Sequence, residues 1–296
     1  MKPCVIFNPV VGGEKASEFR SRLASLETEL VLRPTTSPES TRELALAAVK
    51  EGFESIVAVG GDGTFNEVLN GVGQVEGAFD TVRLGLLPLG TANVFAKELG
   101  LPLNLTDALE VLRRDRIDLV DLALATFREG NKDVRRYFGQ LAGAGLDVRA
   151  IELVDWEAKK RYGSLAYVAS GWRAILEEQV ALTVSNGSES CSGELVLIGN
   201  GRFYGGKFEL FPGATLTDGL LHAAVFDRVR WFDLARRGWG LLTKTISRQE
   251  GVRLIRGERL HLSSERDARF QLEGDLVGQL PCSFQVFPRK LQMIVP

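Results

Sequence analysis

The segment Gly60-Gly61-Asp62-Gly63-Thr64 has the residue types and spacing that most clearly indicate chemistry. Three glycines in four positions permit a tight turn and a close approach of the backbone to a ligand. The segment lies between an apolar run, 55–59, and a helical pattern, so its amides and those of Phe65 and Asn66 can point toward an anion. This pattern favours phosphate binding by residues 60–66 over a purely structural turn. The segment is neither a Walker A loop nor a GxGxxG fingerprint.

Polar or small residues follow three other apolar runs in the same way. They are Asn8 after residues 4–7, Thr35 after residues 31–32, and Gly90 and Thr91 after residues 84–87. In an open α/β sheet, the loops at the carboxyl ends of neighbouring strands line the ligand crevice. The four loops together therefore predict a nucleotide cleft.

The elements that position these loops follow from hydrophobic periodicity. Through residue 99, short apolar runs alternate with helical patterns, such as Phe19, Leu23, Leu26 and Leu30 and the stretch that begins at Pro38. This alternation predicts a parallel α/β sheet. Beyond about residue 118 extended segments dominate, and they predict a β-rich, antiparallel domain. These segments are 117–126, 137–142, 180–184, 195–199, 220–226, 259–262, 270–272 and 282–287, with helical stretches at 146–160, 164–178 and 230–246.

Composition excludes several classes of protein. The 296 residues carry a formal net charge of -2, which argues against a nucleic-acid binder. Three scattered cysteines without a CxxC pair, and two histidines, exclude a disulfide scaffold and a thiolate zinc site. No apolar run approaches the roughly 20 residues of a membrane span, and the first residues lack the apolar region of a signal peptide. We therefore expect a cytoplasmic protein.

Five segments in chain order resemble the bacterial diacylglycerol kinase and lipid kinase family, which is related to the sphingosine kinases. They are NPVVGG from Asn8, VGGDGTFNEVLNG from Val59, LPLGTANVFAKELGLP from Leu87, GGKFELFPGATLTDGLLHAAVF from Gly205 and EGDLVGQLP from Glu273. GGDGT alone is shared with NAD kinases and phosphofructokinases, but the set is more specific. The resemblance covers essentially the whole chain, from about Val5 to Val295.

This resemblance implies two domains. Residues 1–120 are expected to form an α/β nucleotide-binding domain like those of phosphofructokinases and NAD kinases, and residues 121–287 a β-sandwich for the lipid. The final segment, 288–296, is expected to pack back on the first domain. The implied activity is transfer of the γ-phosphoryl group of ATP, with Mg²⁺, to the hydroxyl of diacylglycerol or a related lipid in the cleft between the domains.

The resemblance also implies roles for single residues in binding. Residues 60–66 match the loop that binds the ATP phosphates, and Thr35 and Thr91 match threonines at the nucleotide. Asp218 matches an aspartate that holds a structural Mg²⁺ with backbone carbonyls, here those of Thr215 and Leu220, and oxygen ligands suit this ion. The alternative for Asp218 is an ordinary hairpin turn, and both can hold at once.

Two departures from the family pattern concern catalysis. The general base is usually the first acid of Asp-Gly-Glu, but this chain has Glu273-Gly274-Asp275. Glu273 is the expected base, Asp275 is the alternative, and an impaired site is the third reading. Val94 stands where many relatives carry aspartate, so the catalytic Mg²⁺ would depend more on Asp62 and Asp118. Asp118 could equally be a residue that merely starts a strand.

Residues 228–248 are the candidate contact with a membrane surface. They hold six basic residues and one acidic residue, interleaved with tryptophan, phenylalanine and leucine. This composition suits peripheral, transient contact with anionic lipid. The alternative is an amphipathic helix packed on the β-rich domain with its arginines in water. A homodimer is the other assembly considered.

Two other functions stay open from the sequence. A catalytically weak nucleotide- or lipid-binding protein would fit the Glu273 and Val94 departures. An NAD kinase-type phosphotransferase would also use the glycine-rich segment, although the later segments speak against it. The acceptor lipid cannot be read from the sequence.

Overall fold

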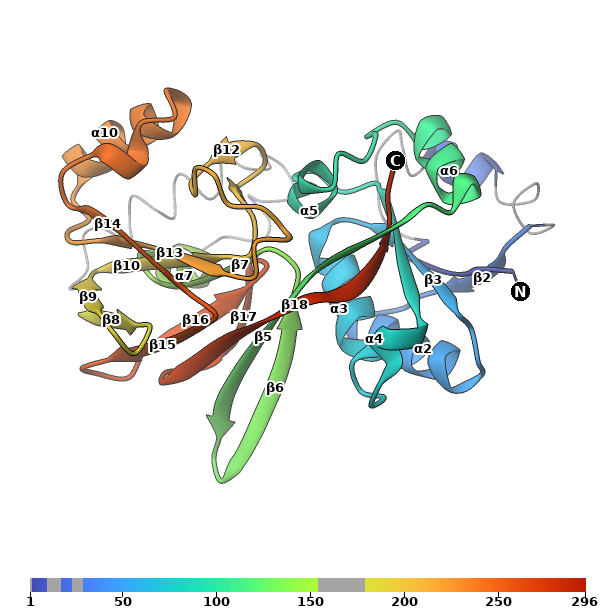
Figure 1. Cartoon of the computed structure of the whole chain (residues 1–296), viewed down its shortest axis with the longest axis horizontal. Helices are drawn as coiled ribbons and strands as arrows, with labels where there is room; N and C mark the ends of the chain where they lie inside the picture. The colour runs from blue at the N-terminus through green and yellow to red at the C-terminus, as the bar shows by residue number, and fades with distance from the viewer. Residues whose placement is uncertain (1, 10–16, 23–28, 154–178) are drawn as a thin grey trace.

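The computed structural model describes residues 2–9, 17–22, 29–153 and 179–296. The predicted helix 164–178, most of the helix 146–160, and Leu23 and Leu26 lie outside these residues. Figure 1 shows an α/β part built from the N-terminal third and a β-rich part built from the remainder. The predicted fold class is confirmed: an N-terminal α/β domain precedes a C-terminal β-sandwich.

The N-terminal part is a parallel sheet covered by helices on both faces. Its strands lie in the order β2-β1-β3-β4. The elements are β1 (Cys4–Phe7), β2 (Val31–Pro34), α2 (Pro38–Lys50), β3 (Ser55–Gly60), α3 (Asp62–Val72), α4 (Ala78–Thr81), β4 (Arg83–Pro88), α5 (Val94–Glu98) and α6 (Leu105–Arg114).

Side chains on successive strand residues point to opposite faces of this sheet. Cys4 and Ile6 of β1 pack in one core cluster with residues of α2 and α3, whereas Val5 and Phe7 pack in another with α6 and Phe19. Both faces are therefore buried, which explains the uninterrupted apolar runs of β1 and β3. The sequence analysis did not predict α6, although Asn104 caps its first turn by accepting the amide of Asp107.

Two long strands tie this sheet to the β-rich part. They are β5 (Ile117–Glu129) and β18 (Cys282–Ile294), which pair antiparallel along their length. The end of β18 also pairs parallel with β4, placing Met293 beside Leu84. One continuous sheet therefore runs from the N-terminal α/β part into the sandwich (Figure 1).

Two sheets form the β-rich part. The first continues through β18, β15, β8 and β9 with β5 and β6, and the second has the order β14-β13-β10-β7-β16-β17. Side chains of both sheets, such as Phe284 and Phe270, share one core cluster. The remaining elements are β6 (Lys132–Phe138), β7 (Leu141–Gly145), α7 (Leu146–Glu152), β8 (Leu182–Ser185), β9 (Ser190–Gly193), β10 (Leu195–Gly199), β11 (Phe203–Tyr204), β12 (Phe208–Glu209), β13 (Leu221–Phe226), α10 (Trp231–Leu242), η1 (Ile246–Arg248), β14 (Val252–Gly257), β15 (Arg259–Ser264), β16 (Arg269–Leu272) and β17 (Asp275–Gln279).

The single strand predicted at 137–142 was wrong. Residues 132–138 belong to β6 in the first sheet and residues 141–145 to β7 in the second. The chain crosses between the sheets at Gly139-Gln140. The side-chain amides of Asn200 and Asn70 hold the backbone at the crossing and just before it. Asn200 donates to the carbonyl of Gly139 at 3.0 Å, and Asn70 donates to that of Tyr137 at 2.8 Å.

Asn70 links α3 of the first domain to β6 of the second. Besides donating to the Tyr137 carbonyl, its Oδ1 accepts the Tyr137 amide at 2.9 Å. The side chain is buried, so both backbone groups of Tyr137 would lose a partner without it. Buried polar groups left unpaired cost about 1–3 kcal/mol each.

We expect Asn70→Ala to lower the free energy of unfolding by about 2 kcal/mol or more for this reason. Urea unfolding followed by far-ultraviolet circular dichroism measures the change. The control is Asn186→Ala, because Asn186 also bonds backbone groups but is only half-buried and its bonds are exposed. Equal losses in the two variants would contradict a special role for the Asn70 link.

Candidate active site

The two glycine-containing loops of the N-terminal domain touch each other through their backbones. The amides of Leu89 and Gly90 donate to the carbonyl of Gly60 at 2.9 and 3.2 Å. A Cβ atom at Gly61 would lie 3.2 Å from the Cα of Gly90, and a Cβ at Gly90 would collide with the Cα of Gly61. Only glycine fits at this contact, which fixes the two loops as one surface.

The first turn of α3 leaves backbone amides at this surface. Its N-cap, Gly61, has no side chain that could accept them, and the open amides of a helix start favour an anion. Phe65 and Asn66 lie beneath the surface. The Phe65 amide closes the first turn by donating to Gly61, and its ring stacks on Phe95 at 4.6 Å. These two residues support the loop from below.

Asp62 connects the same surface to α5. Its Oδ1 accepts the amide of Phe95 at 3.0 Å, so it satisfies one of the open donors at the start of α5. Asn93, the N-cap of α5, has a left-handed φ of 48° and donates its side-chain amide to the carbonyl of Gly90 at 2.7 Å. Val94 is buried here, so Asp62 supplies the carboxylate at this helix start.

Glu273 faces this surface from the other domain. Its Oε1 accepts the amides of Gln140 and Leu141, at 2.6 and 3.2 Å, at the crossing between the two sheets. Burial raises the pKa of Glu273 to about 8, and the negative charge of Asp62 also raises it. The backbone amides around Gln140 oppose this rise by stabilising the charged form. A carboxyl that titrates near neutral pH suits a general base.

A second polar network fixes the turn that carries Glu273. Glu273 and Gly274 have left-handed φ angles of 54° and 88°. Gln271, which is buried, accepts the Gly274 amide at 2.7 Å and donates to Asp147 at 2.8 Å. Tyr204 donates to the other oxygen of Asp147 at 3.2 Å. The turn is therefore held by side chains as well as by the sheet.

Asp275 is the first residue of β17 and also reaches the glycine loop. Its Oδ2 lies 3.9 Å from the position of a Cβ at Gly63. The structure thus brings together the loop 60–64, Asp62, Glu273 and Asp275, from both domains.

The remaining nucleotide-binding candidates lie at the ends of their strands. Thr35 is buried, and its amide donates to the carbonyl of Phe7 at 2.8 Å, which places the ends of β2 and β1 side by side. Asn8 is exposed just after β1, and Thr91 is exposed between β4 and α5. Their contacts with a nucleotide stay predictions.

The predicted metal ligand Asp218 lies in a tight turn that it closes itself. Its oxygens accept the amides of Thr215 and Leu220 at 3.1 and 2.9 Å, and His222 lies 2.9 Å away. The structure therefore shows these residues as amide donors to Asp218, whereas the prediction used their carbonyls. Asp121, which sequence reasoning missed, anchors the turn by accepting the Gly219 amide at 2.7 Å.

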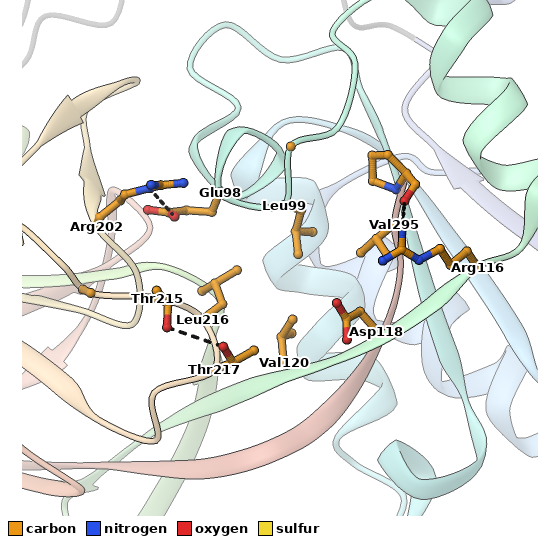
Figure 2. Close-up of a pocket in the computed structure, with 13 residues that line it drawn as sticks. Glu98, Leu99, Arg116, Asp118, Val120, Arg202, Thr215, Leu216, Thr217 and Val295 are labelled. Carbon is orange, nitrogen blue, oxygen red and sulfur yellow. Dashed lines mark hydrogen bonds and ion pairs between the residues drawn. The ribbon is translucent and has the colours of Figure 1, made fainter.

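Asp118 lies in a different pocket of about 420 Å³ between the domains (Figure 2). This pocket is lined by the end of α5, the start of β5, the loop 214–217 and the chain terminus, and Asp118 is bonded to the amide of Leu119 at 3.0 Å. Asp62 instead caps the opposite end of α5. The structure therefore does not bring Asp118 to the group around Glu273. Among the described residues, no group of three His, Cys, Asp or Glu side chains is arranged to hold a metal ion.

Glu98 and Gln140 support the active site from the side of this pocket, and the sequence analysis missed both. The Glu98 side chain is buried and accepts the side-chain amide of Gln140 at 3.1 Å and the Phe203 amide at 2.6 Å. Arg202 lies 3.4 Å from it (Figure 2). The backbone amide of the same residue, Gln140, donates to Glu273. These contacts therefore link the pocket to the proposed base.

Comparisons with known proteins agree with the two-domain fold. Residues 2–125 match the diacylglycerol kinase catalytic domain, and residues 140–295 match the YegS C-terminal NAD kinase beta sandwich-like domain. The chain belongs to the diacylglycerol kinase family. It is therefore a lipid kinase by family, a phosphotransferase class with an alcohol as acceptor.

Relatives of this family match over nearly their whole length. A diacylglycerol kinase of Staphylococcus haemolyticus is 26% identical, with 100% of this chain and 89% of that protein covered. A probable lipid kinase YegS-like of Stenotrophomonas maltophilia is 28% identical, with 90% and 87% covered. A crystal structure of a diacylglycerol kinase from Bacillus anthracis has the same fold, with a TM-score of 0.78, 22% identity, and 100% and 97% covered.

The raised pKa of Glu273 predicts how stability depends on pH. Between pH 4.5 and about 8 the folded protein keeps a proton on Glu273 that the unfolded chain has released. Raising the pH through this window therefore lowers the free energy of unfolding. We expect Glu273→Gln, which cannot ionise, to lack this part of the fall in unfolding free energy with rising pH. Urea unfolding at pH 5, 6.5 and 8 measures that slope. Asp275→Asn is the control and should keep it. Identical slopes for wild type and Glu273→Gln would contradict the buried, protonated carboxyl.

The contact between the glycine loops predicts a second outcome. Gly90→Ala places a methyl group against Gly61 and must push the loops apart. We expect at least a roughly tenfold weaker affinity for ATP, because the backbone no longer fits around the phosphates. Isothermal titration calorimetry measures the affinity. Gly238→Ala is the control, since a Cβ there meets no atom within 4 Å. Unchanged ATP affinity in Gly90→Ala would place the nucleotide elsewhere.

Proposed function

We propose that the protein transfers the γ-phosphoryl group of ATP to the hydroxyl of diacylglycerol or a related lipid. The observation that carries the proposal is the position of Glu273, whose carboxylate is held by the amides of Gln140 and Leu141 opposite the loop 60–64. In this arrangement Glu273 of one domain would act as the base, opposite a loop of the other domain that would bind the phosphates. Membership in the lipid kinase family supports the same conclusion.

The chain's residues divide the work of the reaction. The amides of residues 62–64 and the loop at Gly90 and Thr91 would bind the ATP phosphates. Deprotonated Glu273 would take the proton of the lipid hydroxyl while the oxygen of that hydroxyl bonds to the γ-phosphorus. The bond between the γ-phosphorus and the bridging oxygen would break, and ADP would leave with its electrons. Asp62 and the amides around Gln140 would keep Glu273 poised to gain and lose that proton.

Mg²⁺ enters the proposal with ATP, as part of the nucleotide substrate. It would neutralise charge on the phosphates, and Asp62 is the carboxylate of this chain that lies at the phosphate loop. The turn at Asp218 is the proposed second site. Its carboxylate retains lone pairs beyond the three donors it meets, and the carbonyls of Thr215 and Leu220 belong to the same turn. A cation there would pin the turn.

A lipid substrate requires the protein to work at a membrane surface. No helix in the described part of the chain has the length and apolar character to cross a bilayer. We therefore propose transient, peripheral contact with the membrane from the cytoplasm. The three cysteines, all free and buried, are consistent with a reducing compartment.

The test is transfer of labelled γ-phosphate from ATP to lipids in mixed micelles with Mg²⁺. The panel contains diacylglycerol, monoacylglycerol, ceramide, sphingosine and phosphatidylglycerol, with NAD as the control for an NAD kinase activity. We expect one lipid class to be labelled, a loss of about 100-fold or more in Glu273→Gln, and a smaller loss in Asp275→Asn. The value of kcat/KM should rise with pH up to about 8 in wild type.

Each contrary result has a distinct meaning. Labelling of NAD alone would replace the lipid by a nucleotide acceptor. A larger loss in Asp275→Asn than in Glu273→Gln would make Asp275 the base. Binding of ATP without a labelled product from any lipid would favour a nucleotide- or lipid-binding protein in place of an enzyme.

A further inference from the structure

Helix α10 exposes three large apolar side chains to solvent. Phe232, Trp239 and Leu242 are 65%, 68% and 66% exposed. Trp239 and Leu242 follow Phe232 by seven and ten residues, about two and three turns, so the three side chains form a stripe along one side of the helix. We call these three residues the apolar stripe. In the view of Figure 1, α10 lies at the outer edge of the β-rich part.

The opposite side of α10 buries an arginine. Arg237 is 5% exposed, and its guanidinium lies 4.8 Å from the ring centroid of Phe226. Its Nε and one terminal nitrogen have no hydrogen-bond partner among the described residues. A helix that only covers the sandwich would bury its apolar side chains and expose its arginines. This helix buries Arg237 and exposes the stripe, which argues against the purely structural reading of residues 228–248.

The segment that contains the stripe is net positive, although the whole protein is slightly negative. Residues 227–250 hold six arginine or lysine and three aspartate or glutamate residues, against a net charge of -2 for the chain. Lys244, at the end of α10, lies 3.2 Å from Glu209 of β12 and so joins the two elements. The hairpin of β11 and β12, whose second strand contacts α10, carries exposed Lys207 and Phe208. Apolar and aromatic groups among cations suit the boundary of an anionic bilayer.

A second copy of the chain is a poorer match for this surface. Stable protein interfaces bury about 800 Å² and roughly 20–30 residues on each partner. The stripe offers three large apolar side chains on a 12-residue helix, within a segment of net positive charge. Two such surfaces would also bring like charges together. A lipid surface has neither difficulty.

We propose that α10 docks the protein on an anionic lipid bilayer, with the apolar stripe inserted at the boundary between headgroups and acyl chains. Arg236, Lys244 and Lys207 would then lie against the lipid phosphates. The proposal rests on the proposed function, since a lipid kinase must reach substrate in a membrane. It adds the element that makes the contact and the charge of the lipid it selects.

The test compares the wild type with Phe232→Ser/Trp239→Ser in the full-length protein. Both side chains are mostly exposed, and urea unfolding verifies that stability is kept. Binding to vesicles of 70% phosphatidylcholine and 30% phosphatidylglycerol is measured by co-sedimentation without ATP. We expect binding to fall about tenfold or more in the double variant. Leu119→Ser is the matched control, because Leu119 is 41% exposed on β5 in the other domain, and it should bind as wild type does.

A second comparison tests whether the protein selects anionic lipid. We expect Lys207→Gln/Lys244→Gln to weaken binding to the anionic vesicles, and binding of the wild type to fall when phosphatidylglycerol is left out or salt is raised. Equal binding to vesicles with and without phosphatidylglycerol would overturn the role of the cations.

Substrate presentation separates this proposal from the proposed function. The double variant should lose activity on diacylglycerol in vesicles but keep it on dihexanoylglycerol dissolved below its micelle concentration. A wild type that phosphorylates dihexanoylglycerol without binding vesicles would overturn docking and leave the kinase function intact. Vesicle binding that is lost in the variant, with no lipid phosphorylated by the wild type, would support docking and contradict the kinase function. If sedimentation equilibrium shows that the double variant changes self-association instead of vesicle binding, the stripe is a contact between copies and the proposal fails.

Discussion

The active site depends on one buried carboxylate that two backbone amides hold between two domains. Glu273 lies where the chain crosses from one sheet to the other, and the amides it receives come from the crossing itself. Regular sheet would use these amides in the ladder, so the break at Gly139-Gln140 is what frees them. Burial and Asp62 then hold the pKa of Glu273 near neutral, where a carboxylate can both accept and return a proton.

Polar side chains in the interior keep this crossing in place. Asn200 bonds the carbonyl of Gly139, Asn70 bonds both backbone groups of Tyr137, and Glu98 bonds the side chain of Gln140. Each satisfies groups that a broken strand would otherwise leave unpaired in the core. Because their partners come from both domains, the same bonds that support the fold also set the distance between the loop 60–64 and Glu273.

Local pattern and long-range contact explain what the sequence could and could not predict. The glycine loop at 60–64 and the strand before it are visible because both depend on adjacent residues. Helix α6 was missed although Asn104 and its buried leucines were readable signals. Glu98 and Asn70 could not be found in this way, since their partners lie 42 and 67 residues away. Nothing in the sequence near Arg237 indicates that this side chain faces inward and the apolar stripe outward.

The departures from the family pattern make physical sense together. With Val94 in the core, the start of α5 has no carboxylate of its own, and Asp62 from the phosphate loop occupies that place. Asp62 therefore serves α5 and lies close enough to raise the pKa of Glu273. Glutamate has one methylene more than aspartate, so Glu273 can extend to the amides at Gln140 while its backbone stays in the left-handed turn held by Gln271. In this chain the exchange of the two acids is thus matched by its surroundings, which argues for a working base over an impaired site.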